Sequence, residues 1–318
     1  MHNRSLKLLL GLLGTVLGIA LCVCLYLFAV NYNTASTVVG YIGPDNGASY
    51  LNISDLEQRL TLAGNTFEKN EKDESLSQAA ARMIEAEARI IIAEQLKPED
   101  SAVLAKAAQA SSTTLLFVGS RPRQSVLTQS DKAWYLGSNE AHGGELLGTE
   151  IANNFKEGSI ADTNNDHILQ IMVVNESEIT QYALEESEHL GVYTQVLDYN
   201  DELGNALPFT AEAFAEAQKP EFILCSTDED ARAAYDLAHQ IGWQDVRIGC
   251  AAPNKAAAQK LRDGGITDLP IPYYDVETVT AAAADFALNA LDFQFISQNT
   301  ELIPNDNDHF LVPYQLFE

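Results

Sequence analysis

The stretch Ile168-Leu169-Gln170-Ile171-Met172-Val173-Val174 decides the fold, because it restarts a pattern that has already run once along the chain. This apolar run is rich in β-branched residues and follows a polar loop, which is typical of a buried strand. Strand-like runs and amphipathic helix-like runs alternate both before and after it. Such alternation predicts parallel sheets covered by helices on both faces. Two series, each of about five strands, therefore predict an α/β protein with two doubly wound lobes.

The first series is expected to start at residues 37–42, and the second to end at residues 271–274. The other expected strands are 60–63, 88–93, 114–118, 132–136, 168–174, 193–197, 221–225 and 246–250. The expected helices are 76–87, 100–111, 143–154, 210–218, 228–241, 256–263 and 276–291, with one more that ends near Leu190.

The charge balance excludes one class of partner. The sequence has 45 acidic and 19 basic side chains, which gives a formal net charge of −26 at pH 7. A chain with this charge repels phosphate backbones, so nucleic acid is not an expected partner. Hydrophobic residues make up 46% of the sequence, which is typical of a folded protein and not of disorder.

Two of the four cysteines, Cys225 and Cys250, lie outside the apolar N-terminal segment. Neither has CxxC spacing or a nearby His, so a metal-thiolate or redox site is not indicated. Two buried thiols and one disulfide both remain open, because only the distance between the two residues decides between them.

An apolar segment near the N-terminus predicts a membrane anchor. Residues Leu8–Val30 contain no charged side chain and are long enough to span a bilayer. Two basic residues precede this segment and none follows until Arg59, which predicts that the rest of the chain faces outward. A cleaved signal peptide is the alternative, although its best cleavage site, Asn33-Thr34-Ala35, is poor. We therefore expect residues 1–35 to form a cytoplasmic tail, one transmembrane helix and a linker in the cell membrane.

Five stretches of the sequence are informative when taken together: Asp131–Asn139, Gly144 with Gly148–Ala152, Asp162–Asp166, Ser226–Ala231 and Val312-Pro313-Tyr314. These stretches resemble the bacterial periplasmic galactose/glucose-binding proteins. No stretch is specific alone, but their order and spacing across residues 37–318 carry the resemblance.

The resemblance implies a type I periplasmic-binding fold, in which the chain crosses between two lobes three times. The crossings are expected near residues 136–139, 273–276 and 295–300. The N-terminal lobe would then comprise 36–137 plus 275–297, and the C-terminal lobe 138–274 plus 298–318. A small-molecule ligand is expected between the lobes, at the carboxyl ends of the strands.

An oxygen-rich loop before the strand at 168–174 predicts a cation site. Side-chain or carbonyl oxygens recur there at alternate positions, a spacing that suits calcium. A 2-1-3-4-5 sheet would bring one more carboxylate to the same edge, and the resemblance implies a structural calcium on the same residues. The expected ligands are Asp162, Asn164, Asp166, Ile168, Gln170 and Glu221. A polar turn that binds nothing is the alternative, and His167 stands where such loops usually have Gly.

The resemblance also implies a sugar site, but much of its polar set is missing. The expected ligand-binding residues are Tyr50, Thr227, Asp228 and Asp275. The loop 175–180 lacks the His and Arg of the family, and Ala48 takes the place of an acid. Ligand hydroxyls without partners are costly to bury, so the ligand is expected to differ from galactose, or to be absent.

These observations predict a membrane-tethered, extracytoplasmic solute-binding protein of the sugar-binding, galactose-type family that serves an ABC importer. The alternative is a sensing or accessory domain that acts on a membrane partner, such as a histidine kinase, without tight sugar binding. An enzyme is not expected, because no HExxH, GxSxG or phosphate-loop pattern occurs in the sequence.

Overall fold

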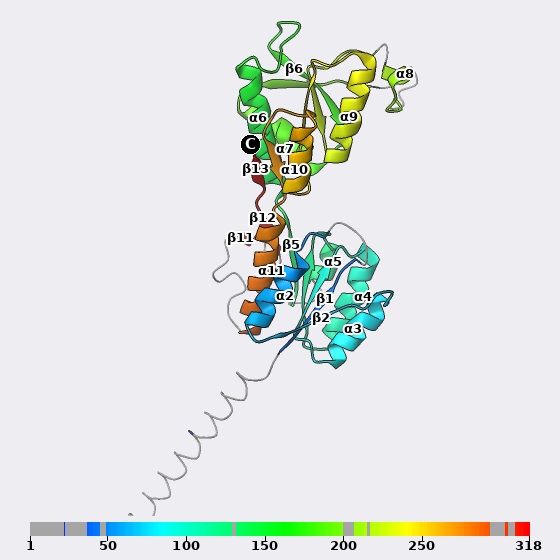
Figure 1. Ribbon diagram of the computed structural model, residues 1–318, viewed down its shortest axis with the longest axis vertical. Coiled ribbons are helices and arrows are strands. Elements are labelled where there is room, and N and C mark those ends of the chain that lie inside the picture. The colour runs from blue at the N-terminus through cyan, green and yellow to red at the C-terminus, as the bar shows by residue number, and fades with distance from the viewer. Residues whose placement is uncertain are drawn as a thin grey trace, which may run out of the picture.

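The computed structural model describes residues 22, 37–44, 49–128, 132–199, 207–214, 217–292, 303–304 and 309–318. Figure 1 shows two lobes that are joined by extended segments. Within the described ranges, no helix is both long and apolar enough to cross a bilayer. The predicted anchor, Leu8–Val30, lies outside these ranges apart from Cys22.

The N-terminal lobe is built on a seven-stranded sheet with the order β11-β12-β5-β4-β3-β1-β2, in which only the β11–β12 pair is antiparallel. Its strands are β1 (Val38–Ile42), β2 (Thr66–Lys69), β3 (Ile90–Glu94), β4 (Thr114–Val118), β5 (Ala133–Ser138), β11 (Ile303–Pro304) and β12 (His309–Val312). One face packs on α2 (Ile53–Leu62) and α11 (Val276–Leu291). The other face packs on α3 (Leu76–Glu85), α4 (Pro98–Gln109) and α5 (Gln124–Thr128).

The C-terminal lobe is built on the parallel sheet β7-β6-β8-β9. These strands are β6 (Ile168–Val174), β7 (Tyr193–Val196), β8 (Phe222–Cys225) and β9 (Arg247–Cys250). A bridge between Ala252 and Tyr273 adds β10 (Ile271–Tyr273), which pairs antiparallel with β13 (Gln315–Phe317). One face packs on α6 (Glu140–Lys156) and α7 (Glu178–His189), and the other on α8 (Ala211–Phe214), α9 (Asp228–Ile241) and α10 (Lys255–Asp263).

Both sheets contain the strand order 2-1-3-4-5, which was the order expected for the C-terminal lobe. It reads β2-β1-β3-β4-β5 in one lobe and β7-β6-β8-β9-β10 in the other. The prediction of two doubly wound, mostly parallel lobes is therefore confirmed. In such sheets all the carboxyl ends of the parallel strands lie along one edge.

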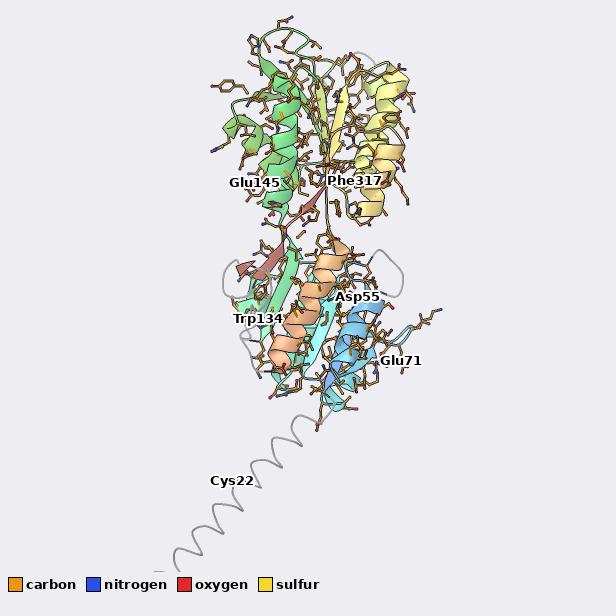
Figure 2. The ribbon with its side chains drawn as sticks, turned by 60° about the vertical axis from the view of Figure 1, so that its left-hand side comes forward. Cys22, Asp55, Glu71, Trp134, Glu145 and Phe317 are labelled. Atoms are coloured by element: carbon orange, nitrogen blue, oxygen red, sulfur yellow. The ribbon has the colours of Figure 1, made fainter. Side chains whose placement is uncertain are left out.

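Three segments of the chain pass between the lobes. The first runs from β5 to α6 through Asn139, and the second from β10 to α11 through Tyr274 and Asp275. The third runs from β12 to β13 through Pro313 and Tyr314. Figure 2 shows Trp134 of β5 in one lobe and Phe317 of β13 in the other.

The position of the third crossing corrects the expectation of 295–300. β12 lies parallel to β5, with Phe310 opposite Leu136, so it belongs to the N-terminal sheet. The expectation that 298–318 belong to the C-terminal lobe holds for β13 but is wrong for β11 and β12. The segment His309–Val312 satisfies its backbone groups by pairing with β5 at the edge of that sheet before the chain crosses.

Two expected elements differ in the structure. Residues Leu60–Ala63, expected as a strand, form the end of α2, whose N-cap Asn52 accepts a hydrogen bond from the Asp55 backbone N–H at 3.2 Å. Leu56 and Leu60 lie one turn apart and are both fully buried, so helical periodicity outweighed the apolar run. The helix expected at 210–218 is reduced to α8 among the described residues.

Candidate functional site

Five side chains gather where the three crossings meet the carboxyl ends of the N-terminal strands. Each crossing contributes one of them: Glu140 follows the first, Tyr274 lies in the second and Tyr314 in the third. Tyr50, just before α2, and Tyr135, in β5, complete the group. We call these five residues the crossing cluster.

Four members of the crossing cluster touch through ring edges and hydroxyl groups, while the fifth, Tyr135, donates its hydroxyl to the Gly119 carbonyl at 2.9 Å. Tyr274 packs edge-to-face against Tyr50, with ring centroids 5.3 Å apart, and against Tyr314, with centroids 6.4 Å apart. The Tyr314 hydroxyl donates to Glu140 Oε2 at 3.2 Å, and the Ser138 hydroxyl donates to Glu140 Oε1. The cluster therefore links all three crossings through one carboxylate and its aromatic neighbours.

A second carboxylate, Glu94 at the end of β3, holds Tyr50 in place. Glu94 is buried and accepts hydrogen bonds from the Tyr41 hydroxyl, the Ser49 hydroxyl and the Tyr50 backbone N–H. Gly119 leaves the space that the Tyr50 ring occupies, since a Cβ at Gly119 would lie 2.8 Å from that ring. Glu94 and Gly119 thus position the aromatic side chain that the sequence predicted for ligand contact.

Burial dominates the electrostatics of the crossing cluster. It raises the pKa of Glu140, and the nearby charge of Glu178 raises it further, against the lowering effect of the Ser138 and Tyr314 hydroxyls. Burial also raises the pKa of Tyr274 well above its usual range, with added effects from Tyr135, Tyr50, Tyr314 and Glu94. The Tyr274 hydroxyl has no hydrogen-bond partner among the described residues.

The structure places the predicted ligand residues at strand ends but does not gather them all. Tyr50 lies in the crossing cluster. Asp275 caps α11 and binds the backbone N–H of Thr278 at 3.3 Å, while Thr227 caps α9 and binds that of Asp230 at 3.1 Å. Asp228, in the first turn of α9, lies 3.7 Å from Arg232. Ala48 is outside the described residues.

At the amino end of β6, the predicted cation ligands do come together. We call Asp162–Gln170 with Glu221 the oxygen-rich loop. Gln170 Nε2 donates to Asp166 Oδ2 at 3.2 Å and to the Ile168 carbonyl at 2.8 Å. Asn164 Nδ2 donates to Asp166 Oδ2 at 2.8 Å and to Gln170 Oε1 at 3.3 Å.

The carboxylates of the oxygen-rich loop accept hydrogen bonds from its own backbone. Asp162 accepts from the N–H groups of Asp166 and His167, at 3.2 and 3.0 Å. Glu221, 5% exposed, accepts from the Thr163 N–H and from the Gln170 N–H at 3.2 Å. Bonding to the Ile168 N–H lowers the pKa of Asp166, and its bonds to Asn164 and Gln170 contribute to the same shift.

His167 takes the left-handed backbone conformation that the loop requires, with φ of 61°. Asn165 has a similar φ of 59°. Across the described part of the chain, no group of three or more His, Cys, Asp or Glu side chains is arranged to hold a metal. The oxygen-rich loop is instead a mixed set of acids, amides and one backbone carbonyl.

Cys225 and Cys250 lie opposite each other at the ends of β8 and β9, and both are free, buried thiols. Burial raises the pKa of the Cys250 thiol to about 12 and that of Cys225 well above its usual range. Because the thiolate is the reactive form, these cysteines are inert at neutral pH.

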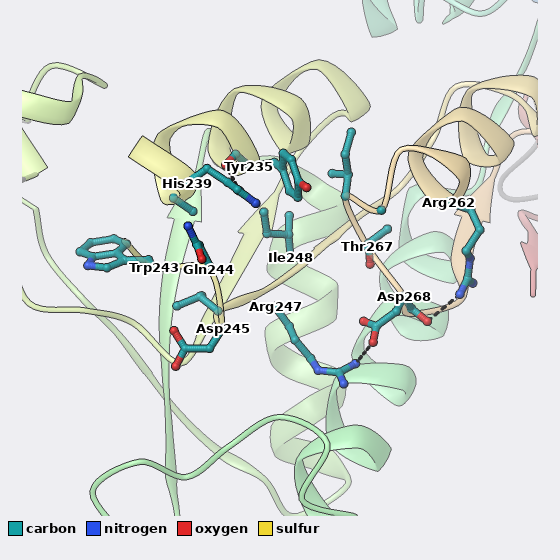
Figure 3. A pocket seen from close by; sticks show the side chains of 14 residues that line it. Tyr235, His239, Trp243, Gln244, Asp245, Arg247, Ile248, Arg262, Thr267 and Asp268 are labelled. Carbon is teal, nitrogen blue, oxygen red and sulfur yellow. Dashed lines mark hydrogen bonds and ion pairs between the residues drawn. The ribbon is translucent and has the colours of Figure 1, made fainter. Parts of the chain in front are cut away.

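A separate pocket of about 430 Å³ lies at the amino end of β9, between the ends of α9 and α10 (Figure 3). Its charged groups are already engaged: Arg247 pairs with Asp268, and Arg262 donates to the Asp268 carbonyl at 2.7 Å. Since it opens at the edge opposite the strand carboxyl ends, it is not the site that the switch-point rule indicates.

Sequence reasoning missed Glu94, which holds Tyr50, and four of the five members of the crossing cluster: Tyr135, Glu140, Tyr274 and Tyr314. Glu94 ends the buried run Ile90–Glu94, and an acid at the carboxyl end of such a strand was the available signal. Tyr274 directly follows β10, at the expected second crossing.

Comparison by sequence finds no family model and no curated protein that match this chain. Comparison of structures does find similar folds. A complex named XylFII-LytSN shares 11% identity at a TM-score of 0.61, over 89% of this chain and 98% of that one. A Mycobacterium smegmatis ABC transporter solute-binding protein with bound glycerol shares 12% identity at a TM-score of 0.58, over 89% of this chain and 94% of that one. A Bacillus halodurans ABC transporter solute-binding protein with bound myo-inositol shares 14% identity at a TM-score of 0.55, over 89% of this chain and 95% of that one.

The two solute-binding neighbours are not enzymes, which agrees with the expectation from the sequence. Identities this low establish the fold and no more. Two doubly wound lobes, three crossings and this structural likeness together show that the chain has the type I periplasmic-binding-protein fold.

Proposed function

We propose that this chain is an extracytoplasmic solute-binding protein, whose lobes close on a small polar ligand beside the crossing cluster. The observation that carries the proposal is the meeting of all three crossings at one carboxylate, Glu140, and its tyrosines. A ligand held there contacts the segments about which the lobes turn, so binding and hinge closure are coupled. The solute-binding proteins of similar fold support this function.

The chain serves an ABC importer in this proposal. The tether is the apolar segment Leu8–Val30, which keeps the lobes at the outer face of the cell membrane. Glycerol and myo-inositol in the neighbouring proteins support a polar ligand. Galactose itself is disfavoured, because the loop 175–180 supplies neither His nor Arg.

One observation favours a second candidate, in which the chain acts on a membrane sensor. The neighbour with a TM-score of 0.61 is a complex of two differently named proteins, XylFII and LytSN. A lobe pair of this fold can therefore also work by docking on another protein. This candidate matches the alternative drawn from the eroded sugar site.

The oxygen-rich loop is proposed to hold a structural calcium ion. Three oxygens expected as ligands, two from Asp166 and the Ile168 carbonyl, already converge on Gln170 Nε2 at 2.8–3.4 Å. Rotation of the Gln170 amide would replace this N–H donor with Oε1, as a cation requires. The left-handed His167 removes the objection that only Gly fits the sixth position.

A solute screen on the full chain in detergent micelles tests the proposed function. Sugars, polyols, amino acids and amines are added one class at a time, and the melting temperature and the heat of binding are measured. We expect one class to bind saturably and to raise the melting temperature. Binding of no class, together with co-purification of a sensor protein, would replace solute capture with the second candidate.

A further inference from the structure

We propose that the crossing cluster selects a small organic cation with a protonated primary amine, in preference to a neutral sugar. This inference rests on the proposed solute-binding function and names the ligand class of the same site. Three features of the cluster support it: an unpaired hydroxyl, an uncompensated carboxylate and a set of aromatic faces.

The unpaired hydroxyl belongs to Tyr274, whose side chain is held between Tyr50 and Tyr314. Tyr274 is only 3% exposed, and among the described residues its hydroxyl has no hydrogen-bond partner. A buried hydroxyl without a partner is costly, so the site gains when a ligand supplies one. The hydroxyl oxygen can accept a hydrogen bond from a ligand N–H.

The uncompensated carboxylate is Glu140, because Arg121, whose charge acts on Tyr135 in the cluster, forms no ion pair with Glu140 among the described residues. Glu140 accepts hydrogen bonds only from neutral hydroxyls, those of Ser138 and Tyr314, among the interactions of the described residues. No ion pair formed by the described residues involves Glu140 or its neighbour Glu178. A ligand cation would balance this charge at a partly buried carboxylate, where the attraction is stronger than in bulk water.

The aromatic faces come from the tyrosines of the cluster. A cation is attracted to the face of an aromatic ring, and more strongly when it is desolvated. Tyr50 and Glu140 are each partly exposed, which leaves the group accessible from solvent on one side. Neutral sugars, in contrast, need planar polar groups that bind pairs of hydroxyls, and the cluster provides only one carboxylate for this purpose.

The test uses two pairs of ligands in which ammonium groups replace hydroxyl groups, two of them in the first pair and one in the second. They are 1,4-diaminobutane with 1,4-butanediol, and D-glucosamine with D-glucose. Each is titrated calorimetrically into the full chain in detergent micelles at neutral pH. We expect at least one amine to bind about tenfold or more tightly than its neutral partner.

Two substitutions locate the binding. Tyr274→Phe and Glu140→Gln are each expected to weaken the amine by about tenfold or more, because each removes one charge-assisted contact. Tyr193→Phe is the control, since Tyr193 is 72% exposed in β7, away from the crossings. A Tyr274→Phe melting temperature at or above that of the parent chain shows that lost binding is not lost folding.

The possible outcomes distinguish the inference of an amine ligand from the proposed solute-binding function. Equal or tighter binding of the neutral partners overturns the choice of an amine but keeps solute binding. Amine binding that both substitutions leave unchanged overturns the site. Failure of all four compounds also overturns the amine inference, while the wider solute screen decides the proposed function separately.

Discussion

In the oxygen-rich loop, carboxylates accept hydrogen bonds from backbone N–H groups, whereas in the crossing cluster Glu140 accepts only from side-chain hydroxyls among the described residues. Asp166 bonds the N–H of Ile168 at 2.8 Å, and its pKa is lowered. Glu140 is reached by Tyr314 from the far end of the sequence, and its pKa is raised by burial and by Glu178. The first region stabilises its negative charge locally, and the second leaves charge for something else to balance.

The comparison distinguishes polar groups that stabilise the fold, as in the oxygen-rich loop, from polar groups that are available to bind a solute, as in the crossing cluster. A loop that satisfies its own donors holds its shape with or without an added ion. A cluster with a buried hydroxyl and an unbalanced acid loses stability until a partner arrives. Four substitutions test this contrast.

The largest effect is expected for Glu221→Ala in the oxygen-rich loop. Removing the carboxylate leaves the buried N–H of Gln170 and the N–H of Thr163 at the surface without their acceptor. We expect the free energy of unfolding to fall by about 3 kcal/mol, as measured by urea denaturation. Calcium should raise the melting temperature of the parent chain and have no effect on this variant.

Glu221→Gln is the matched control, because it keeps one acceptor oxygen and loses only the charge. It should unfold at a denaturant concentration between those of the parent chain and Glu221→Ala. A calcium response that survives in Glu221→Ala would remove Glu221 from the proposed ligands.

A smaller loss is expected for Gly119→Ala at the crossing cluster. Gly119 has a φ of 81°, and the added Cβ would lie 2.8 Å from the Tyr50 ring. Left-handed strain and the displaced ring together should cost about 2 kcal/mol in the free energy of unfolding. Gly191→Ala is the control, since φ is 84° there and nothing lies within 4 Å of its Cβ. Equal costs at the two positions would show that Tyr50 moves away freely.

Glu140→Gln should raise the melting temperature slightly at neutral pH. The raised pKa of Glu140 means that its contribution to stability is present below the ordinary pKa of Glu and is lost as pH rises through the raised pKa. The amide in Glu140→Gln does not ionise and so avoids this loss of stability. The melting temperatures of Glu140→Gln and the parent chain should therefore converge in acid. Thermal melts across a pH series measure this convergence, and a variant less stable at neutral pH would contradict an unbalanced Glu140.

Asp166→Asn should show the smallest effect, of the opposite sign. The lowered pKa of Asp166 means that its contribution is present above the ordinary pKa of Asp and is lost as pH falls through the lowered pKa. The variant should melt slightly below the parent chain at neutral pH and converge with it in acid. If both acid variants shift in the same direction, the contrast between the two regions fails.

The sequence predicted those parts of the molecule that rest on local periodicity. The alternation around Ile168–Val174 is a short-range signal, and it correctly indicated two lobes built on mostly parallel sheets. The oxygen-rich loop was found in the same way, because most of its members lie within Asp162–Gln170 and only Glu221 comes from another strand.

The crossing cluster could not be found from spacing, because its residues are far apart in the sequence. Tyr50 lies in the N-terminal lobe and Tyr274 in the second crossing, and their rings meet only in the folded chain. Leu60–Ala63 shows the same limit on a smaller scale, since one burial pattern fits a strand or the last turn of a helix until Asn52 is seen to cap α2. The expected position of the third crossing was wrong because the pairing of β12 with β5 leaves no local pattern in the sequence.

The short passage from β12 to β13 has a mechanical consequence. Only Pro313 and Tyr314 separate a strand of one sheet from a strand of the other, and the proline ring fixes one backbone torsion. Any rotation of the lobes must therefore twist the few remaining torsions beside Tyr314, whose hydroxyl rests on Glu140. Tyr314 therefore responds both to the angle between the lobes and to the protonation of Glu140.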